Sequence, residues 1–207
     1  SLWADDSLYP IARRSNIRIV EVDAARPVDG GLPGIAVQPG NKVDGLNSQP
    51  WFSSNNMGRM ADVMAADLVR LAPADKPTIE ANLAALKQRL LKFSADSEAR
   101  LASADNLSVM SLSDHFGYLI GSLNLELIGV DPRPDTEWTP EALKQLTATL
   151  KDNDVAVVMH HRQPSDAVKA AIAEPGSRLV VLSVDGADPV AELEGNVDLV
   201  IKGLSGV

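Results

Sequence analysis

The longest regular pattern of apolar positions lies between Asp75 and Ser103. Apolar side chains recur there mostly at steps of four and three residues, at Ile79, Leu83, Leu86, Leu90, Phe93 and Leu101. This spacing gives a helix one apolar face. Pro77 falls in the first turn, where its missing N–H costs nothing, and no glycine interrupts the run. The pattern predicts a single helix about 40 Å long.

The segments before and after this helix differ in character, which indicates that the helix joins two parts of the chain. We predict a partial N-terminal lobe over residues 1–74, a linking helix over residues 75–103 and a C-terminal α/β lobe over residues 104–207. The alternative is a core helix of one bundle. Strand-like runs on both sides favour the linking helix.

The predicted N-terminal lobe begins with a short helix over residues 1–14 and a β-branched strand over residues 17–22. Glycine and proline are frequent between residues 24 and 48, without any period. This composition predicts a loop, which we expect to be the most mobile internal segment. An amphipathic helix follows and ends before Pro73.

Strand-like and helix-like runs alternate from residue 106 onward. The predicted strands are residues 106–112, 125–130, 155–159, 178–184 and 197–201. Helix starts stand between them, with Thr139 before Pro140 and with Ser165 as N-caps. The alternation predicts an α/β fold with a parallel sheet covered on both faces.

Ligands of such sheets bind beyond the carboxyl ends of the strands. The polar residues at the predicted ends are Ser113, Asp114, His115, Asp131, His160, His161 and Asp185.

Composition narrows the classes of partner. The 207 residues suit one large domain or two small lobes, and the net charge of −9 argues against nucleic acid or an anionic membrane surface as a partner. Without cysteine, the chain has neither disulfides nor thiolate metal sites. No apolar run is long enough to cross a membrane, so we expect no membrane insertion of the mature chain. A start at SLWADD, without Met, predicts a processed N-terminus from which any signal peptide has been removed.

Several short motifs follow one another in a distinctive order between about residues 45 and 207. They are a Trp motif, a short helix, the long helix, a Ser-Asp-His-Phe-Gly-Tyr turn, a Thr-Pro-Glu-Ala-Leu helix start, a Gln-Pro-Ser turn and an Asp after the next strand. In this order the chain resembles the zinc/manganese-type solute-binding proteins of bacterial ABC importers. The resemblance implies two α/β lobes with parallel sheets joined by one long linking helix, the first lobe being reduced here. It also implies a periplasmic or extracytoplasmic receptor that works with an ABC importer permease.

The sequence departs from the metal ligands of that family. The family's His-x-Trp motif appears as Gln49-Pro50-Trp51, so Gln49 takes the place of a ligand. Ser113 likewise stands where the family has His or Glu, and the family's first His would precede residue 1. Asp185 keeps the final carboxylate and is the best single candidate for a metal ligand. Because Ser and Gln are poor zinc ligands, we expect zinc or manganese to bind weakly at this position.

A relocated metal site is conceivable, built from His115, one of the pair His160 and His161, and Asp185. The favoured interpretation is a solvated histidine pair at a strand end, with His115 in the first turn of a helix. Ser113 is then a helix N-cap rather than a nucleophile. Since the chain also lacks a Walker motif and a dinucleotide-binding glycine motif, we do not expect an enzyme.

Two functions therefore stay open. The first is a metal-ion receptor of an ABC importer with a degenerate or altered site. The second is a non-transport interaction or scaffold protein that uses the same fold without a bound metal. Converging polar side chains favour the receptor, and an apolar filling favours the scaffold.

Overall fold

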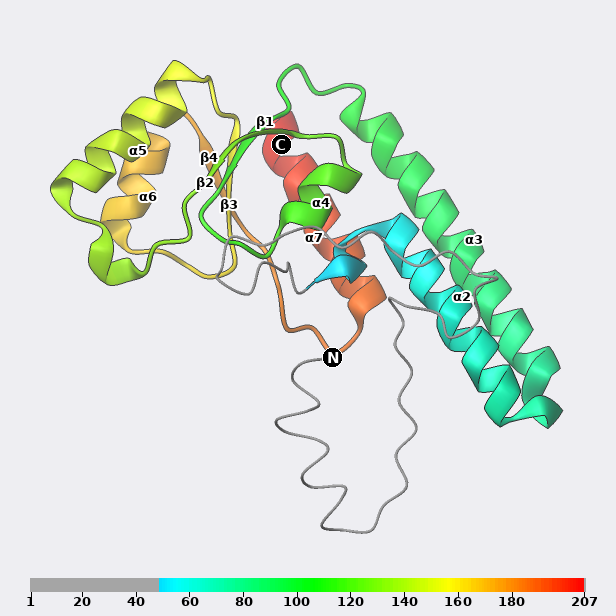
Figure 1. The fold of residues 1–207 in the computed structure, drawn as a ribbon. Coiled ribbons are helices and arrows are strands. Elements are labelled where there is room, and N and C mark those ends of the chain that lie inside the picture. The colour runs from blue at the N-terminus through cyan, green and yellow to red at the C-terminus, as the bar shows by residue number, and fades with distance from the viewer. Residues whose placement is uncertain (1–48, 207) are drawn as a thin grey trace, which may run out of the picture. The chain divides into compact units, whose positions relative to one another are not determined.

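The computed structural model of the protein describes residues 49–206 (Figure 1). The predicted helix, strand and mobile loop of the first 48 residues lie outside the described residues. The described chain divides into two compact units, one of residues 58–86 and one of residues 49–57 together with 87–206. The lobe boundaries that the sequence predicts, at residues 74 and 103, stay a prediction.

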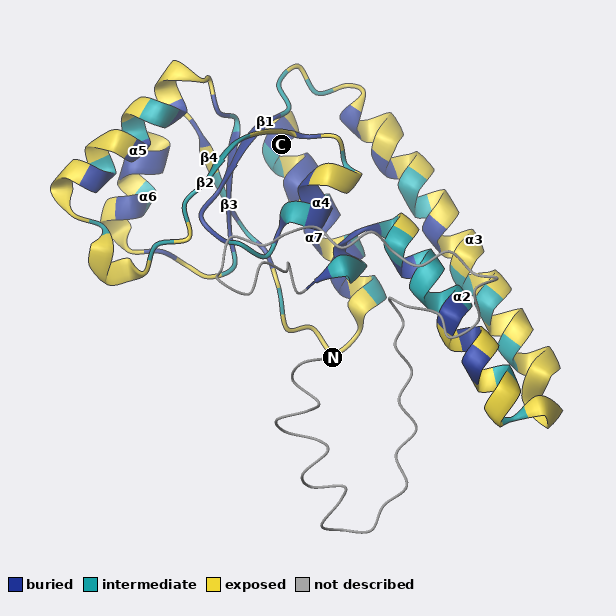
Figure 2. Ribbon diagram, viewed as in Figure 1, coloured by how far each residue is buried: buried dark blue, intermediate teal, exposed yellow. Residues whose placement is uncertain are grey.

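Two long helices follow the 3-10 helix η2 (Pro50–Phe52) at the start of the described residues. Helix α2 (Ser54–Leu71) is followed by the short 3-10 helix η3 (Pro73–Asp75) and by helix α3 (Lys76–Leu101). The predicted unbroken helix is confirmed, because α3 runs for 26 residues without interruption. Figure 2 shows most of its surface as exposed, with buried positions at Leu90, Ser97 and Leu101.

The predicted parallel sheet is confirmed, and within residues 49–206 it has four strands in the order β2-β1-β3-β4. The strands are β1 (Ser108–Ser111), β2 (Glu126–Val130), β3 (Val157–His160) and β4 (Arg178–Val181), all paired in parallel. β1 and β3 are buried throughout, as their apolar runs predict. They are also direct neighbours, which places the turns at their carboxyl ends side by side.

Helices cover both faces of this sheet (Figure 1). Helices α5 (Pro140–Asp152) and α6 (Asp166–Ala173) lie on one face, and their apolar side chains form a core cluster with alternate strand residues such as Met110 and Val158. Helix α7 (Pro189–Ser205) covers the other face, with α4 (Gly117–Ser122) and the 3-10 helix η2 (Pro50–Phe52). The approach of α7 is close, since a Cβ at Gly203 would lie 2.8 Å from the Val180 side chain.

Local signals in the sequence account for most helix boundaries. The Thr139 and Ser165 side chains accept hydrogen bonds from backbone N–H groups at the starts of α5 and α6, as predicted. The predicted strand at residues 197–201 is wrong, because these residues lie inside α7. Their apolar run is too short to distinguish the period of a helix from that of a strand. Asp188 at the N-cap and Gly206 at the C-cap, with φ of 73°, are the local signals of a helix.

The buried side of α3 can be tested with two neighbouring leucines. Leu90 is 4% exposed and Leu91 is 73% exposed. Leu90→Asp places an unpaired charge in the protein interior and should lower the free energy of unfolding by several kcal/mol, at least about 2. Leu91→Asp makes the same change of helix propensity on the solvent side and should cost less than about 1 kcal/mol. Urea unfolding of both variants gives the comparison, and equal losses would contradict the assigned buried side.

Candidate functional site

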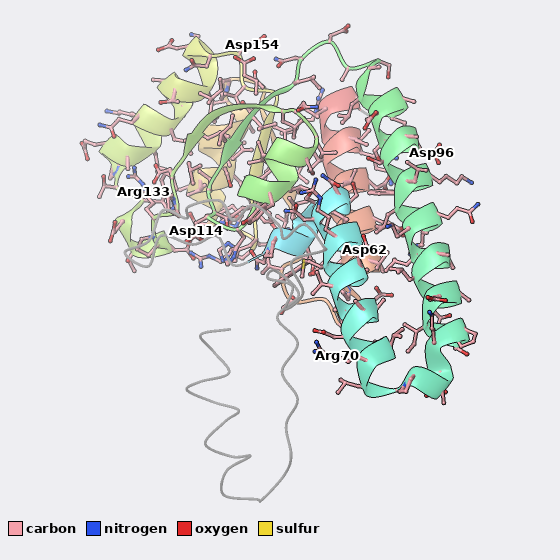
Figure 3. The ribbon with its side chains drawn as sticks, turned by 45° about the vertical axis from the view of Figure 1, so that its right-hand side comes forward. Asp62, Arg70, Asp96, Asp114, Arg133 and Asp154 are labelled. Atoms are coloured by element: carbon pink, nitrogen blue, oxygen red, sulfur yellow. The ribbon has the colours of Figure 1, made fainter. Side chains whose placement is uncertain are left out.

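The polar residues that follow β1 and β3 come together at one edge of the sheet. The backbone N–H of Leu112 donates to the Met159 carbonyl oxygen over 2.8 Å, which continues the pairing of the two strands into the turn. In Figure 3, Asp114 lies at this carboxyl-end edge, whereas Asp154, which precedes β3, lies at the opposite edge. The turn after β1 therefore faces the residues that follow β3.

Gln49 holds His115 through a hydrogen bond across 66 residues of sequence. The distance from Gln49 Oε1 to His115 Nδ1 is 2.8 Å, and Gln49 is only 6% exposed. Because an amide oxygen only accepts, Nδ1 of His115 carries the proton and Nε2 carries the lone pair. The Asp114 carboxylate lies on the Nε2 side, with Oδ1 at 3.8 Å from that nitrogen.

Ser113 makes the corresponding contact with His161. Its Oγ lies 3.0 Å from His161 Nδ1, and it also accepts a longer bond, 3.4 Å, from the His115 backbone N–H. The rings of His115 and His161 meet edge to face, with their centroids 5.0 Å apart. We call Gln49, Ser113, His115 and His161 the histidine cluster. Gln49 and Ser113, predicted from the family pattern, thus contact His115 and His161, which were predicted for a relocated site.

Two details of the sequence interpretation are wrong. Helix α4 begins at Gly117, so Ser113 is not its N-cap and His115 does not lie in its first turn. Instead Ser113 belongs to a turn that Ser111 holds, since Ser111 Oγ donates to the Ser113 carbonyl oxygen over 2.6 Å. His160 and His161 are not a solvated pair either, because His160 is only 2% exposed.

His160 is a buried imidazole outside the histidine cluster. Its Nδ1 atom is buried and has no hydrogen-bond partner. Among the described residues, no other buried side-chain nitrogen or oxygen lacks one. Burial lowers its pKa to about 4, and the neighbouring His161 and Arg162 act in the same direction. Its ring is therefore neutral at pH 7.

Burial also lowers the pKa of His161, and the nearby His115 and Arg162 lower it further, while Asp114 and Asp135 oppose the shift. The neutral imidazole is the form that binds a metal ion. His161 is thus kept in that form at neutral pH.

Asp185 stands apart from the histidine cluster. It is exposed in the loop between β4 and α7, and among residues 49–206 no described hydrogen bond connects it to the cluster. Two buried side chains of α7 hold this loop: Glu192 accepts bonds from Ser183 Oγ and the Gly186 N–H, and Asn196 bonds both backbone groups of Ser183. Sequence analysis missed both residues. A Glu and an Asn four residues apart on the apolar side of a helix indicate buried polar side chains that hold a neighbouring loop.

The described residues do not form a ready-made site with several strong ligands. Across residues 49–206, no three His, Asp or Glu side chains are arranged to hold a metal ion. Gln49 and Ser113 are neutral and are not strong zinc ligands, of which zinc in proteins takes about four. In the same residues, none of the helices has the length and apolar character needed to cross a membrane.

The buried His160 should make the protein less stable in mild acid. Below about pH 6.5 the unfolded chain protonates this residue, whereas the folded protein resists protonation down to about pH 4. Stability should therefore fall as the pH drops through this window, by about 1–3 kcal/mol from this group after allowance for solvent screening. Urea unfolding at pH 7 and pH 4.5 should show a smaller drop for His160→Leu. An equal drop in both proteins would show that His160 does not cause it.

Comparison with known proteins identifies the family of the chain. The family model described as the periplasmic zinc-uptake complex component A, ZnuA, matches residues 6–198. No curated protein sequence matches the chain.

Several solved structures share the fold. A zinc-bound deletion mutant of ZnuA is 23% identical, with a TM-score of 0.73 over 98% of this chain and 75% of that one. A zinc-bound variant of AdcAII from Streptococcus pneumoniae is 18% identical, with a TM-score of 0.73 over 99% and 76%. The solute-binding protein FpvC of Pseudomonas aeruginosa, solved with Ni²⁺, is 23% identical, with a TM-score of 0.68 over 96% and 82%.

At these identities the solved structures show the fold alone, and the family model, which spans most of the sequence, shows the family. The parallel α/β architecture, the long helix α3 and the motif order agree with it. The chain therefore belongs to the ZnuA family, the zinc-type solute-binding proteins of bacterial ABC importers.

Proposed function

We propose that this chain is the substrate-binding component of a metal-ion ABC importer, with an altered site at the family's ligand positions. One observation carries the proposal. Gln49 and Ser113, which stand where the family has ligands, are neutral and hydrogen-bonded to Nδ1 atoms of two histidines. At the family position, Asp185 is left as the remaining carboxylate. We infer that zinc and manganese bind weakly there.

The same proposal includes the partner and the cellular location of the protein. Its partner is an ABC importer permease, its location is periplasmic or extracytoplasmic, and it performs no catalysis. Membership of the family supports these properties. The net charge of −9 agrees with a cationic substrate, because an acidic surface attracts cations.

The histidine cluster favours a receptor over a scaffold protein. Four polar side chains from three separate segments converge on one edge of the sheet. A scaffold without a small ligand has no need for this convergence and is better served by apolar packing.

Restoring the family ligands tests the altered site. Gln49→His combined with Ser113→His should raise zinc affinity at least about tenfold, roughly 1.4 kcal/mol, because two imidazoles are added at the ligand positions of the family. Isothermal titration of the metal-free proteins measures the change.

A control variant separates a site from the mere addition of histidines. Gln145→His combined with Ser205→His adds the same two residues at exposed positions on α5 and α7, and should leave zinc affinity unchanged. Sub-micromolar zinc binding by the unmodified protein that Asp185→Ala abolishes would contradict the altered-site proposal.

A further inference from the structure

The two solvent-accessible histidines of the cluster are oriented as metal ligands are. Metal-binding histidines almost always direct their second ring nitrogen to a hydrogen-bond partner, which fixes the ring and the tautomer. His115 and His161 both have such a partner at Nδ1, in Gln49 Oε1 and Ser113 Oγ. Nε2 of His115 then has a free lone pair, and so has Nε2 of His161 when Ser113 accepts the bond.

The separation of the two rings fits a shared ion. A metal about 2.0 Å from an imidazole nitrogen lies about 3.2 Å from the ring centre, so two rings at an angle between 90° and the tetrahedral value have centres about 4.5–5.2 Å apart. The centroids of His115 and His161 are 5.0 Å apart. The Asp114 carboxylate, with Oδ1 at 3.8 Å from His115 Nε2, adds negative charge beside this position.

We propose that His115 and His161 together bind a late first-row divalent ion, copper or nickel in preference to manganese, through their Nε2 atoms. This inference rests on the proposed function, for which it names the class of substrate. Gln49 and Ser113 are positioning residues that hold the rings without touching the ion.

The chemistry of the donors sets the preference among ions. Imidazole nitrogen suits copper, nickel and zinc, whereas manganese prefers carboxylate and water oxygen, and affinity for a given site rises from Mn²⁺ through Ni²⁺ to Cu²⁺. Two protein nitrogens leave further coordination positions, which water or a small chelator bound to the ion occupies. The ligands of this site, His115 and His161, differ from the family-position residues, although Gln49 and Ser113 contact them.

Titration of the metal-free protein with nickel and manganese chlorides tests the site. We expect one nickel ion per chain, with an affinity at least about tenfold above that for manganese. His115→Gln and His161→Gln should each weaken nickel binding at least about tenfold, because each removes one of two nitrogen ligands. His160→Leu removes the third histidine of the chain, whose buried ring lies against His161 with the centroids 4.8 Å apart. Because this variant removes no proposed ligand, it should weaken nickel binding much less than His115→Gln or His161→Gln. Circular dichroism confirms that the variants are folded.

Copper gives a second reading of the same site. The electron paramagnetic resonance spectrum of the Cu²⁺-loaded protein should show splitting from two imidazole nitrogens, reduced to one in His161→Gln. Nickel affinity that His115→Gln and His161→Gln leave unchanged would overturn the inference, as would a copper spectrum without imidazole nitrogens. Either failure is separate from the proposed function, which the zinc response of Gln49→His with Ser113→His tests at the family position.

Discussion

The parallel pairing of β1 with β3 is the constraint on which the candidate site depends. Because the two strands are direct neighbours with the same direction, the turns at their carboxyl ends meet at one edge. This edge brings Ser113 and His115 to His161, across nearly fifty residues of sequence. Burial of both strands between α7 and the pair α5 and α6 fixes their register, since a slip would expose their apolar side chains.

The histidine cluster gives Gln49 and Ser113 a physical role. Their side-chain oxygens contact the Nδ1 atoms of His115 and His161. Burying polar groups of this kind is costly unless they are hydrogen-bonded, and here they satisfy each other. Under our proposal, these contacts orient two nitrogen ligands at this edge of the sheet.

The sequence predicted the parallel sheet, the long helix and the starts of α5 and α6, because apolar periods and N-caps are local signals. It failed at residues 197–201, where a five-residue apolar run is compatible with either period. The contact of Gln49 with His115 could not be predicted from the sequence, because nothing local to a loop residue indicates a partner 66 positions away. The buried state of His160 was missed because the strand continues one residue beyond its predicted end.

The tautomer of the His115 ring in the metal-free protein tests the central claim, that Gln49 holds this imidazole with Nε2 available. Long-range ¹H–¹⁵N correlation spectra distinguish the two nitrogens of each neutral ring, and His115→Gln identifies the signals. The structure predicts that His115 carries its proton on Nδ1, because Gln49 Oε1 only accepts. A proton on Nε2 instead, with the Gln49 amide N–H donating to Nδ1, would contradict the account.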